Sequence, residues 1–163
     1  MRIVLAIFFI IAGTAAGLYR SAELKKREIL LAELLRLLEK MSAQIRYRAL
    51  PLGDLFTELD SAGGGKFINK VAEYANNGVN RRGAWNEAVC DFGELDPGDR
   101  EILLSVGNSL GGSDIAGQLS MLELSGELLA VRQREAAETS SRKGAVYRSV
   151  GLLAGLGLAI IVI

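Results

Sequence analysis

The sequence predicts an all-α protein in which an antiparallel bundle of about six helices is flanked by N- and C-terminal transmembrane helices. Half of the 163 residues are hydrophobic but only 6% are aromatic, so the apolar content is mostly aliphatic. Leu and Ala favour helices over strands. Apolar residues recur at three- and four-residue steps in the middle of the chain, without the alternation typical of strands. Both ends are uncharged and apolar.

The N-terminal segment, residues 1–19, predicts the first transmembrane helix. Residues 3–19 are 17 uncharged residues that span about 25 Å as a helix, near the lower limit for crossing a bilayer. A cleaved signal peptide is the alternative, because Arg2 is a basic start and a run of small residues resembles a cleavage site. A basic cluster follows directly and favours an anchor, since it holds that side in the cytoplasm. The cluster consists of Arg20, Lys25, Lys26 and Arg27.

The C-terminal segment, residues 149–163, predicts the second transmembrane helix. Its 15 uncharged residues reach the length of a span only if residues 145–147 join them and Arg148 extends toward the headgroups. A buried core helix is the alternative, which is disfavoured because nothing polar interrupts any face of the run. Gly151 and Gly155 have a spacing that lets membrane helices approach closely, so we predict that they pack within the membrane.

Charge predicts that residues 20–148 form a cytoplasmic helical domain and that both termini are extracytoplasmic. Every acidic residue lies between Glu23 and Glu138, and every basic residue except Arg2 lies between Arg20 and Arg148. Because Lys and Arg near transmembrane segments stay in the cytoplasm, the middle of the chain is expected on that side. The net charge is zero and no strongly basic patch is present, so a nucleic-acid partner is not expected.

The middle of the chain divides into helices at Gly, Pro and Asx signals. Residues 22–47 show the first helical pattern, and Pro51 ends it. Short loops between consecutive helices imply antiparallel packing. The later segments are an amphipathic stretch at 54–59, a loop or hinge at Gly63-Gly64-Gly65, and helices at 67–75 (closed by Asn77-Gly78), 85–92 and 97–110, the last with Asp96 as its cap.

The last helix is predicted to start at Ser113-Asp114, where either residue can cap it. No proline follows, so the helix is expected to continue into the C-terminal membrane segment as one rod of about 50 residues. Residues 110–114, which we call the corner, must end one helix and start the rod within about three residues. The side chains expected on the buried face of the rod are Ile115, Leu119, Leu122, Leu129 and Ala136.

The sequence has no recognisable catalytic, cofactor or metal site, so we predict a protein that is not an enzyme and has no cofactor. It lacks His, the usual general base and a common metal ligand. Cys90, the only Cys, is interpreted as a small core residue. Residues 63–66 lack two positions of the phosphate-loop pattern. Asp96, Asp99 and Glu101 fit a helix N-terminus better than an acid/base site.

Three residues have alternative interpretations. Trp85, the only Trp, is interpreted as an anchor of the core, and an interface residue is the alternative. Asp114 and Gln118 lie four residues apart at the start of the last helix. They are interpreted as capping and solvated residues, with a polar contact patch as the alternative.

Taken in order, several short motifs resemble those of the stage III sporulation protein AB family of endospore-forming bacteria, over nearly the whole chain. They are an apolar start ending in Gly17, Gln44-Ile45-Arg46-Tyr47, Leu50-Pro51-Leu52, Trp85, Leu110-Gly111-Gly112-Ser113-Asp114 with Gln118 beyond, and Tyr147 to Gly155. Two features depart from the family. The family often has Glu where Gln44 stands, and often has a Pro within the stretch 24–28, so here the first membrane helix is expected to continue straight on.

The resemblance implies an assembly role without chemistry. Family members belong to the membrane complex that links mother cell and forespore, with a cytoplasmic domain on the mother cell side similar to the F domain of the type II secretion platform. The implied partners are the membrane and other stage III sporulation subunits, including a secretion-type ATPase; a homo-oligomer is one alternative for its assembly. The residues assigned to partner binding or to the corner are Gln44, Tyr47, Pro51, Leu52, Trp85, Leu110, Gly111, Ser113, Asp114 and Gln118.

Two other function classes remain as alternatives. The first is a membrane-anchored helical signalling or adaptor module, and the second, weaker one is an enzyme that uses only carboxylates, Lys and Arg. A hydrophobic cytoplasmic face that is exposed in the isolated protein would favour the scaffold over the adaptor.

Overall fold

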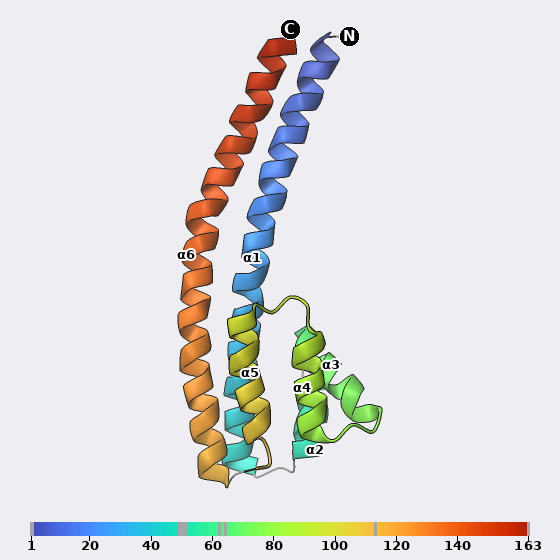
Figure 1. The fold of residues 1–163 in the computed structure, drawn as a ribbon, viewed down its shortest axis with the longest axis vertical. Helices are drawn as coiled ribbons and strands as arrows, with labels where there is room; N and C mark the ends of the chain where they lie inside the picture. Colours follow the sequence, from blue (N-terminus) through green and yellow to red (C-terminus); the bar gives the residue numbers. More distant parts are fainter. Residues whose placement is uncertain (1, 49–51, 62, 64, 113, 163) are drawn as a thin grey trace. The chain divides into compact units, whose positions relative to one another are not determined.

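The computed structural model describes residues 2–48, 52–61, 63, 65–112 and 114–162, and this part of the chain folds into six helices and no strands. The predicted all-α class is therefore confirmed. The helices are α1 (Arg2–Arg48), α2 (Leu52–Ser61), α3 (Gly65–Asn76), α4 (Arg81–Asp91), α5 (Pro97–Ser109) and α6 (Ile115–Val162) (Figure 1). Pro51, Gly64 and Ser113, to which the sequence assigned roles, lie outside the described residues.

The chain divides into two compact units. We call residues 1–29 with 133–163 the hairpin unit, and Leu30–Arg132 the helical unit. Helices α1 and α6 each contribute one part to each unit. The predicted boundaries at residues 19 and 149 refer to a membrane rather than to packing, so they stay predictions.

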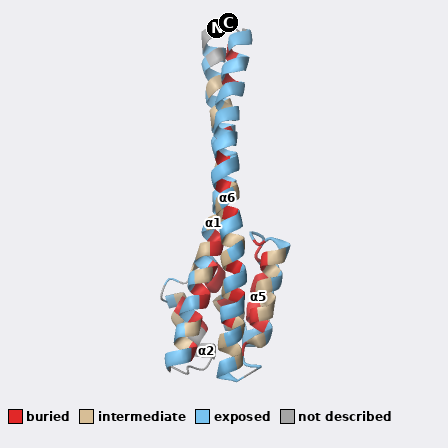
Figure 2. Ribbon diagram, turned by 90° about the vertical axis from the view of Figure 1, so that its left-hand side faces the viewer, coloured by how far each residue is buried: buried red, intermediate tan, exposed pale blue. Residues whose placement is uncertain are grey.

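In the hairpin unit, the first part of α1 runs antiparallel to the last part of α6, and the first turn of α1 lies at the same end as the last turn of α6 (Figures 1 and 2). Both helices are long and apolar enough to cross a membrane. Their apolar side chains are largely exposed: Phe8 and Ile11 by 62% and 63%, and Ile160 by 75%. Soluble proteins rarely expose apolar patches of this extent, so the hairpin unit is compatible with membrane association.

In the helical unit, α3 packs against α2 and α4, and α4 packs against α5. The helix boundaries follow local chemistry. After α3, Gly78 adopts φ +85°, a left-handed conformation that favours glycine. Asn80 then caps α4, since its Oδ1 accepts a hydrogen bond from the Gly83 N–H at 2.8 Å. Pro97 occupies the first turn of α5, where its missing N–H is not needed.

Asp96 stands at the N-cap position of α5, as predicted, although its side chain makes no capping hydrogen bond there. Two other local predictions were wrong. Cys90 is exposed instead of buried, because it follows Ala88 by two residues, or about 200° of helix, which places it on the opposite face. Ile115 is 52% exposed, since the first turn of α6 extends beyond the core that buries Leu122 and Leu129.

Candidate functional site

The two helices of the hairpin unit meet through glycines on both sides. A Cβ added to Gly13 would lie 2.6 Å from the Gly151 carbonyl oxygen and 2.9 Å from the Gly155 Cα. A Cβ added to Gly151 would in turn lie 3.0 Å from the Gly17 Cα. The obstructing atoms belong to the backbone and cannot move aside as a side chain can.

These four residues therefore form two facing pairs with four-residue spacing, Gly13–Gly17 on α1 and Gly151–Gly155 on α6, which we call the glycine seam. The same line of contact continues to Ser21, whose Oγ lies 2.9 Å from a Cβ added at Gly144. The sequence pattern predicted close packing at Gly151 and Gly155 but not at Gly13. The Gly13–Gly17 spacing was a signal that could have identified their partners.

Trp85 lies at the centre of the helical unit and is completely buried. Its ring stacks on Phe56, with centroids 6.1 Å apart, and meets Phe67 edge-on at 5.0 Å. Its indole Nε1–H donates a 2.7 Å hydrogen bond to the Leu103 carbonyl oxygen, so its polar group is satisfied. These contacts place Trp85 in the core and leave no part of it on the surface for a partner.

Two glycines make room for long side chains of α4, and neither role was predicted from the sequence. A Cβ on Gly107 would overlap the Trp85 ring, whose Cγ would be only 3.2 Å away. Gly107 of α5 thus lets Trp85 approach the α5 backbone. A Cβ on Gly112 would likewise meet the guanidinium of Arg82, which reaches from α4 to the corner.

The corner combines a buried residue, a left-handed residue and a cap. Leu110 is 3% exposed and donates its N–H to the Val106 carbonyl, while Gly111 adopts φ +69°. Asp114 caps α6, because its Oδ1 accepts a 2.9 Å hydrogen bond from the Gly117 N–H. The Gln118 N–H bonds to the Asp114 carbonyl oxygen as the first turn of the helix forms. Leu110 and Gly111 also line an open cavity of about 750 Å³ bordered by α2 and α3.

The remaining predicted residues lie around the end of α1 and the start of α2. Gln44 is half-buried and its Nε2 donates a 3.1 Å hydrogen bond to Glu58 Oε1 of α2. Tyr47 is 81% exposed. Leu52 begins α2. The structure therefore brings Gln44 into contact with α2 and leaves the Tyr47 side chain free to meet another molecule.

An exposed polar cluster joins α3 to the end of α4. The ammonium group of Lys70 forms an ion pair with Asp91 Oδ2 and also donates to the Asp91 carbonyl at 3.3 Å. The Tyr74 hydroxyl donates to the same carboxylate at 3.2 Å. The hydrogen bonds from Lys70 and Tyr74 lower the pKa of Asp91, and the hydrogen bond to Asp91 raises the pKa of Lys70. The pKa of Tyr74 is raised mainly by partial burial, and its hydrogen bond to the Asp91 carboxylate raises it further.

Asp99 is the buried carboxylate of the helical unit, at 1% exposure in the first turn of α5. The Arg132 Nε lies 4.0 Å from its Oδ1, and a Cβ on Gly98 would collide with the same guanidinium. Among the residues that the structure describes, no group of three His, Cys, Asp or Glu side chains could hold a metal ion.

Comparison with known proteins places the chain in a family. The sequence model of the family described as stage III sporulation protein AB (spore_III_AB) matches residues 2–163. No curated protein and no solved structure matches the chain. Because the family match spans more than half of the chain, the protein belongs to the stage III sporulation protein AB family, as its motifs indicated.

Proposed function

We propose that this member of the stage III sporulation protein AB family is a non-enzymatic scaffold subunit of the membrane complex that connects mother cell and forespore during endospore formation. In this role the chain positions a cytoplasmic, secretion-type ATPase supplied by another subunit. The observation that carries the proposal is the family match over residues 2–163. The family description names a sporulation protein and no enzymatic activity.

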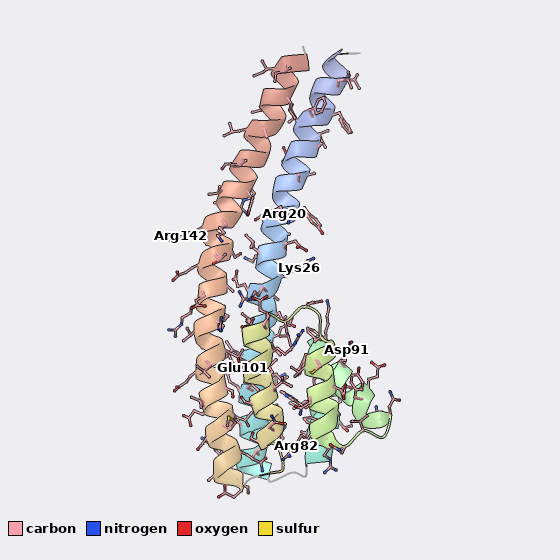
Figure 3. The ribbon with its side chains drawn as sticks, in the orientation of Figure 1. Arg20, Lys26, Arg82, Asp91, Glu101 and Arg142 are labelled. Atoms are coloured by element: carbon pink, nitrogen blue, oxygen red, sulfur yellow. The ribbon has the colours of Figure 1, made fainter. Side chains whose placement is uncertain are left out.

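The hairpin unit anchors the chain in the membrane, with the helical unit in the mother cell cytoplasm and both termini on the other side. The antiparallel arrangement of the hairpin supports this topology, because the two ends of the chain then leave the same face of the bilayer (Figure 1). The charges support it too. Arg20, Lys26 and Arg142 all lie in the part of the hairpin unit away from the termini (Figure 3), where the positive-inside rule puts the cytoplasm.

The helical unit supports a scaffold over a self-contained adaptor, because it exposes apolar side chains. Leu124, Leu128 and Val131 of α6 are 52%, 46% and 53% exposed. Their spacing of four and three residues aligns them along one side of the helix. A stripe of this kind is the usual mark of a surface that another protein covers.

Topology is tested with cysteines placed at residue 2 or after Ile163 and an impermeant thiol reagent. Because Cys90 is exposed, it would react with the reagent in lysed cells, so it is first replaced by Ser. We expect both terminal cysteines to label in intact cells and a control cysteine at Glu87, exposed on α4, to label only after lysis. Terminal cysteines that label only after lysis would refute the proposed orientation.

The scaffold role is tested by purifying the full chain from sporulating cells in mild detergent. We expect other stage III subunits and a secretion-type ATPase to be recovered with it. Recovery of subunits without the ATPase would refute the ATPase-positioning role, and recovery of neither would refute the scaffold role as a whole. ATP hydrolysis that is recovered with the isolated chain and lost in Lys66→Ala would instead show that the chain is an enzyme.

A further inference from the structure

A groove runs between the second half of α1 and the first half of α6, wholly within the helical unit, and has a volume of about 540 Å³. Leu35 and Ala43 of α1 and Leu119 and Ala130 of α6 give it an apolar lining. Exposed Tyr47 also borders it. The long apolar floor between two helices has the form of a groove that receives a third helix.

The charges around the groove are unbalanced. Its charged lining residues are Glu39 of α1, Glu123 and Glu127 of α6, and a single Arg46. All four are exposed. The groove therefore carries three carboxylates against one guanidinium. A bound segment with Lys or Arg along its edges would complement this excess of negative charge.

Gly126 supplies an independent sign that something approaches this groove. It lies in the interior of α6 and lines the groove, yet a Cβ added there would meet no atom within 4 Å. Gly in a helix interior is less stable than Ala, and the chain's own packing offers no compensation here. The glycines of the glycine seam differ, because each avoids a clash with a backbone atom. An occupant whose backbone comes close to α6 explains the missing side chain at Gly126.

We propose that the α1–α6 groove binds an amphipathic helix of another protein, with its apolar face on Leu35 and Leu119 and its Lys or Arg side chains against Glu39, Glu123 and Glu127. This inference rests on the proposed scaffold function, because it identifies the surface through which a partner is held. A second copy of this chain is a poorer fit, since the glutamates would meet those of an identical groove across a symmetric interface. The charge of the groove also disfavours an acidic membrane surface.

The occupant is tested by photocrosslinking the full chain in sporulating cells. A photoreactive amino acid replaces Ser42, which lines the groove, or Glu87 on α4, which does not. The cross-linked peptides are then sequenced. We expect the probe at 42 to attach to a segment of another protein that has helical periodicity, an apolar face and net positive charge. The probe at 87 should not attach to that segment.

Charge reversal tests which chemistry selects the occupant. Glu123→Lys combined with Glu127→Lys should reduce the cross-link yield at position 42 about tenfold, because attraction becomes repulsion. The matched control is Glu135→Lys with Glu138→Lys, the same change of charge on exposed residues of α6 outside the groove, which should leave the yield unchanged.

Gly126→Ala distinguishes an effect on partner binding from an effect on folding stability, because the two are expected to change in opposite directions. The added methyl group should raise the thermal midpoint of the full chain by about 2–4 °C, since Ala is the better helix former. It should lower the cross-link yield about fivefold, since it occupies the space that the partner backbone needs. Gly157→Ala is the matched control, because it is also an open glycine of α6 but lies outside the groove, and should not change the yield.

Three results would overturn the proposal: cross-links to a second copy of this chain, cross-links to an acidic segment, or no cross-link at position 42. If position 42 gives no cross-link while the ATPase and other subunits are still recovered with the chain, the groove is not the docking surface and the scaffold function stands. If neither cross-links nor subunits are recovered, both proposals fail.

Discussion

The two units bring their helices together by opposite means, although α1 and α6 take part in both. In the hairpin unit the contact is made by Gly13, Gly17, Gly151 and Gly155, with backbone against backbone. In the helical unit it is made by rings and long aliphatic chains around the buried Trp85. Lipid tails are as apolar as Leu, so helices in a membrane gain most from close approach of their backbones. In water, by contrast, the burial of large apolar side chains contributes most to stability. The make-up of each interface thus fits the proposal that lipid surrounds the hairpin unit and water surrounds the helical unit.

The largest expected effect is on the helical unit, from Trp85→Ala. Removing a fully buried Trp should lower the free energy of unfolding by about 3–5 kcal/mol, because it leaves a cavity between Phe56 and Phe67. The effect is measured by circular dichroism during denaturation of the full chain. Trp85→Phe keeps one aromatic ring and loses the rest of the indole together with the hydrogen bond to the Leu103 carbonyl, so it should leave a smaller cavity and cost clearly less than Trp85→Ala. If the two variants destabilise equally, packing of the indole is not what stabilises this unit.

Gly13→Val should destabilise the hairpin unit and leave the stability of the helical unit unchanged, the opposite of what is expected for Trp85→Ala. The Val side chain would collide with the Gly151 carbonyl, at a cost of about 1–3 kcal/mol. A cysteine pair reports on this contact. Ser21 Cβ lies 3.8 Å from a Cβ built on Gly144, the usual separation across a disulfide, so Ser21→Cys with Gly144→Cys should cross-link when Cys90 is Ser. Gly13→Val should lower the yield of this disulfide and leave the unfolding of the helical unit unchanged.

Gly157→Val serves as the control for the glycine seam. A Cβ at Gly157 meets nothing within 4 Å, so the disulfide yield should match that of the parent. An equal loss of disulfide in both variants would mean that β-branched residues disturb α1 or α6 generally, and that the glycine seam has no special role in closing the hairpin.

The features that the sequence predicted well are encoded locally. The helix ends at Gly78 and Gly111 follow from residues that tolerate positive φ, and the start of α5 follows from Pro97. The single helix α1 follows from the absence of proline between the predicted membrane segment and the first amphipathic pattern. Each of these depends on a few neighbouring residues, so no knowledge of tertiary contacts is needed.

The features that it missed depend on which distant residues meet. The burial of Asp99 beside Arg132, and the fit of Trp85 against Gly107, join separate helices whose register no local pattern encodes. The face of Cys90 is a different kind of error, since helical periodicity alone would have placed it opposite Trp85 and Ala88. The candidate groove was missed because the sequence does not show that the space beside Gly126 is empty.

A smaller loss of stability should distinguish Asp114, which makes a capping hydrogen bond, from Asp96, which occupies an N-cap position without one. Asp114→Ala removes the hydrogen bond to the Gly117 N–H and should cost about 1 kcal/mol. Asp96→Ala should cost less through capping, because the Asp96 side chain makes no such bond at the start of α5. Thermal unfolding of the two variants measures the difference. A greater loss in Asp96→Ala would mean that the other interactions of Asp96 matter more to stability than the Asp114 cap at the corner.

The smallest effect is the pH dependence contributed by the exposed cluster of Lys70, Tyr74 and Asp91. The folded-state pKa of Asp91 is below its ordinary value of 3.8, so its contribution is present above that value and lost as pH falls through the lowered pKa. The folded-state pKa of Lys70 is above its ordinary 10.5, so its contribution is complete below that value and lost as pH rises through the raised pKa. The stability difference between the parent and Asp91→Asn should therefore be constant from about pH 5 to 9 and shrink on either side.

Denaturant midpoints of the parent and Asp91→Asn, measured from low to high pH, test this prediction. Glu94→Gln, which breaks the looser and more exposed pair with Lys66 at 3.8 Å, is the control and should give a smaller difference. A difference between parent and Asp91→Asn that stays constant down to about pH 2 would mean that its source is not the ionised carboxylate.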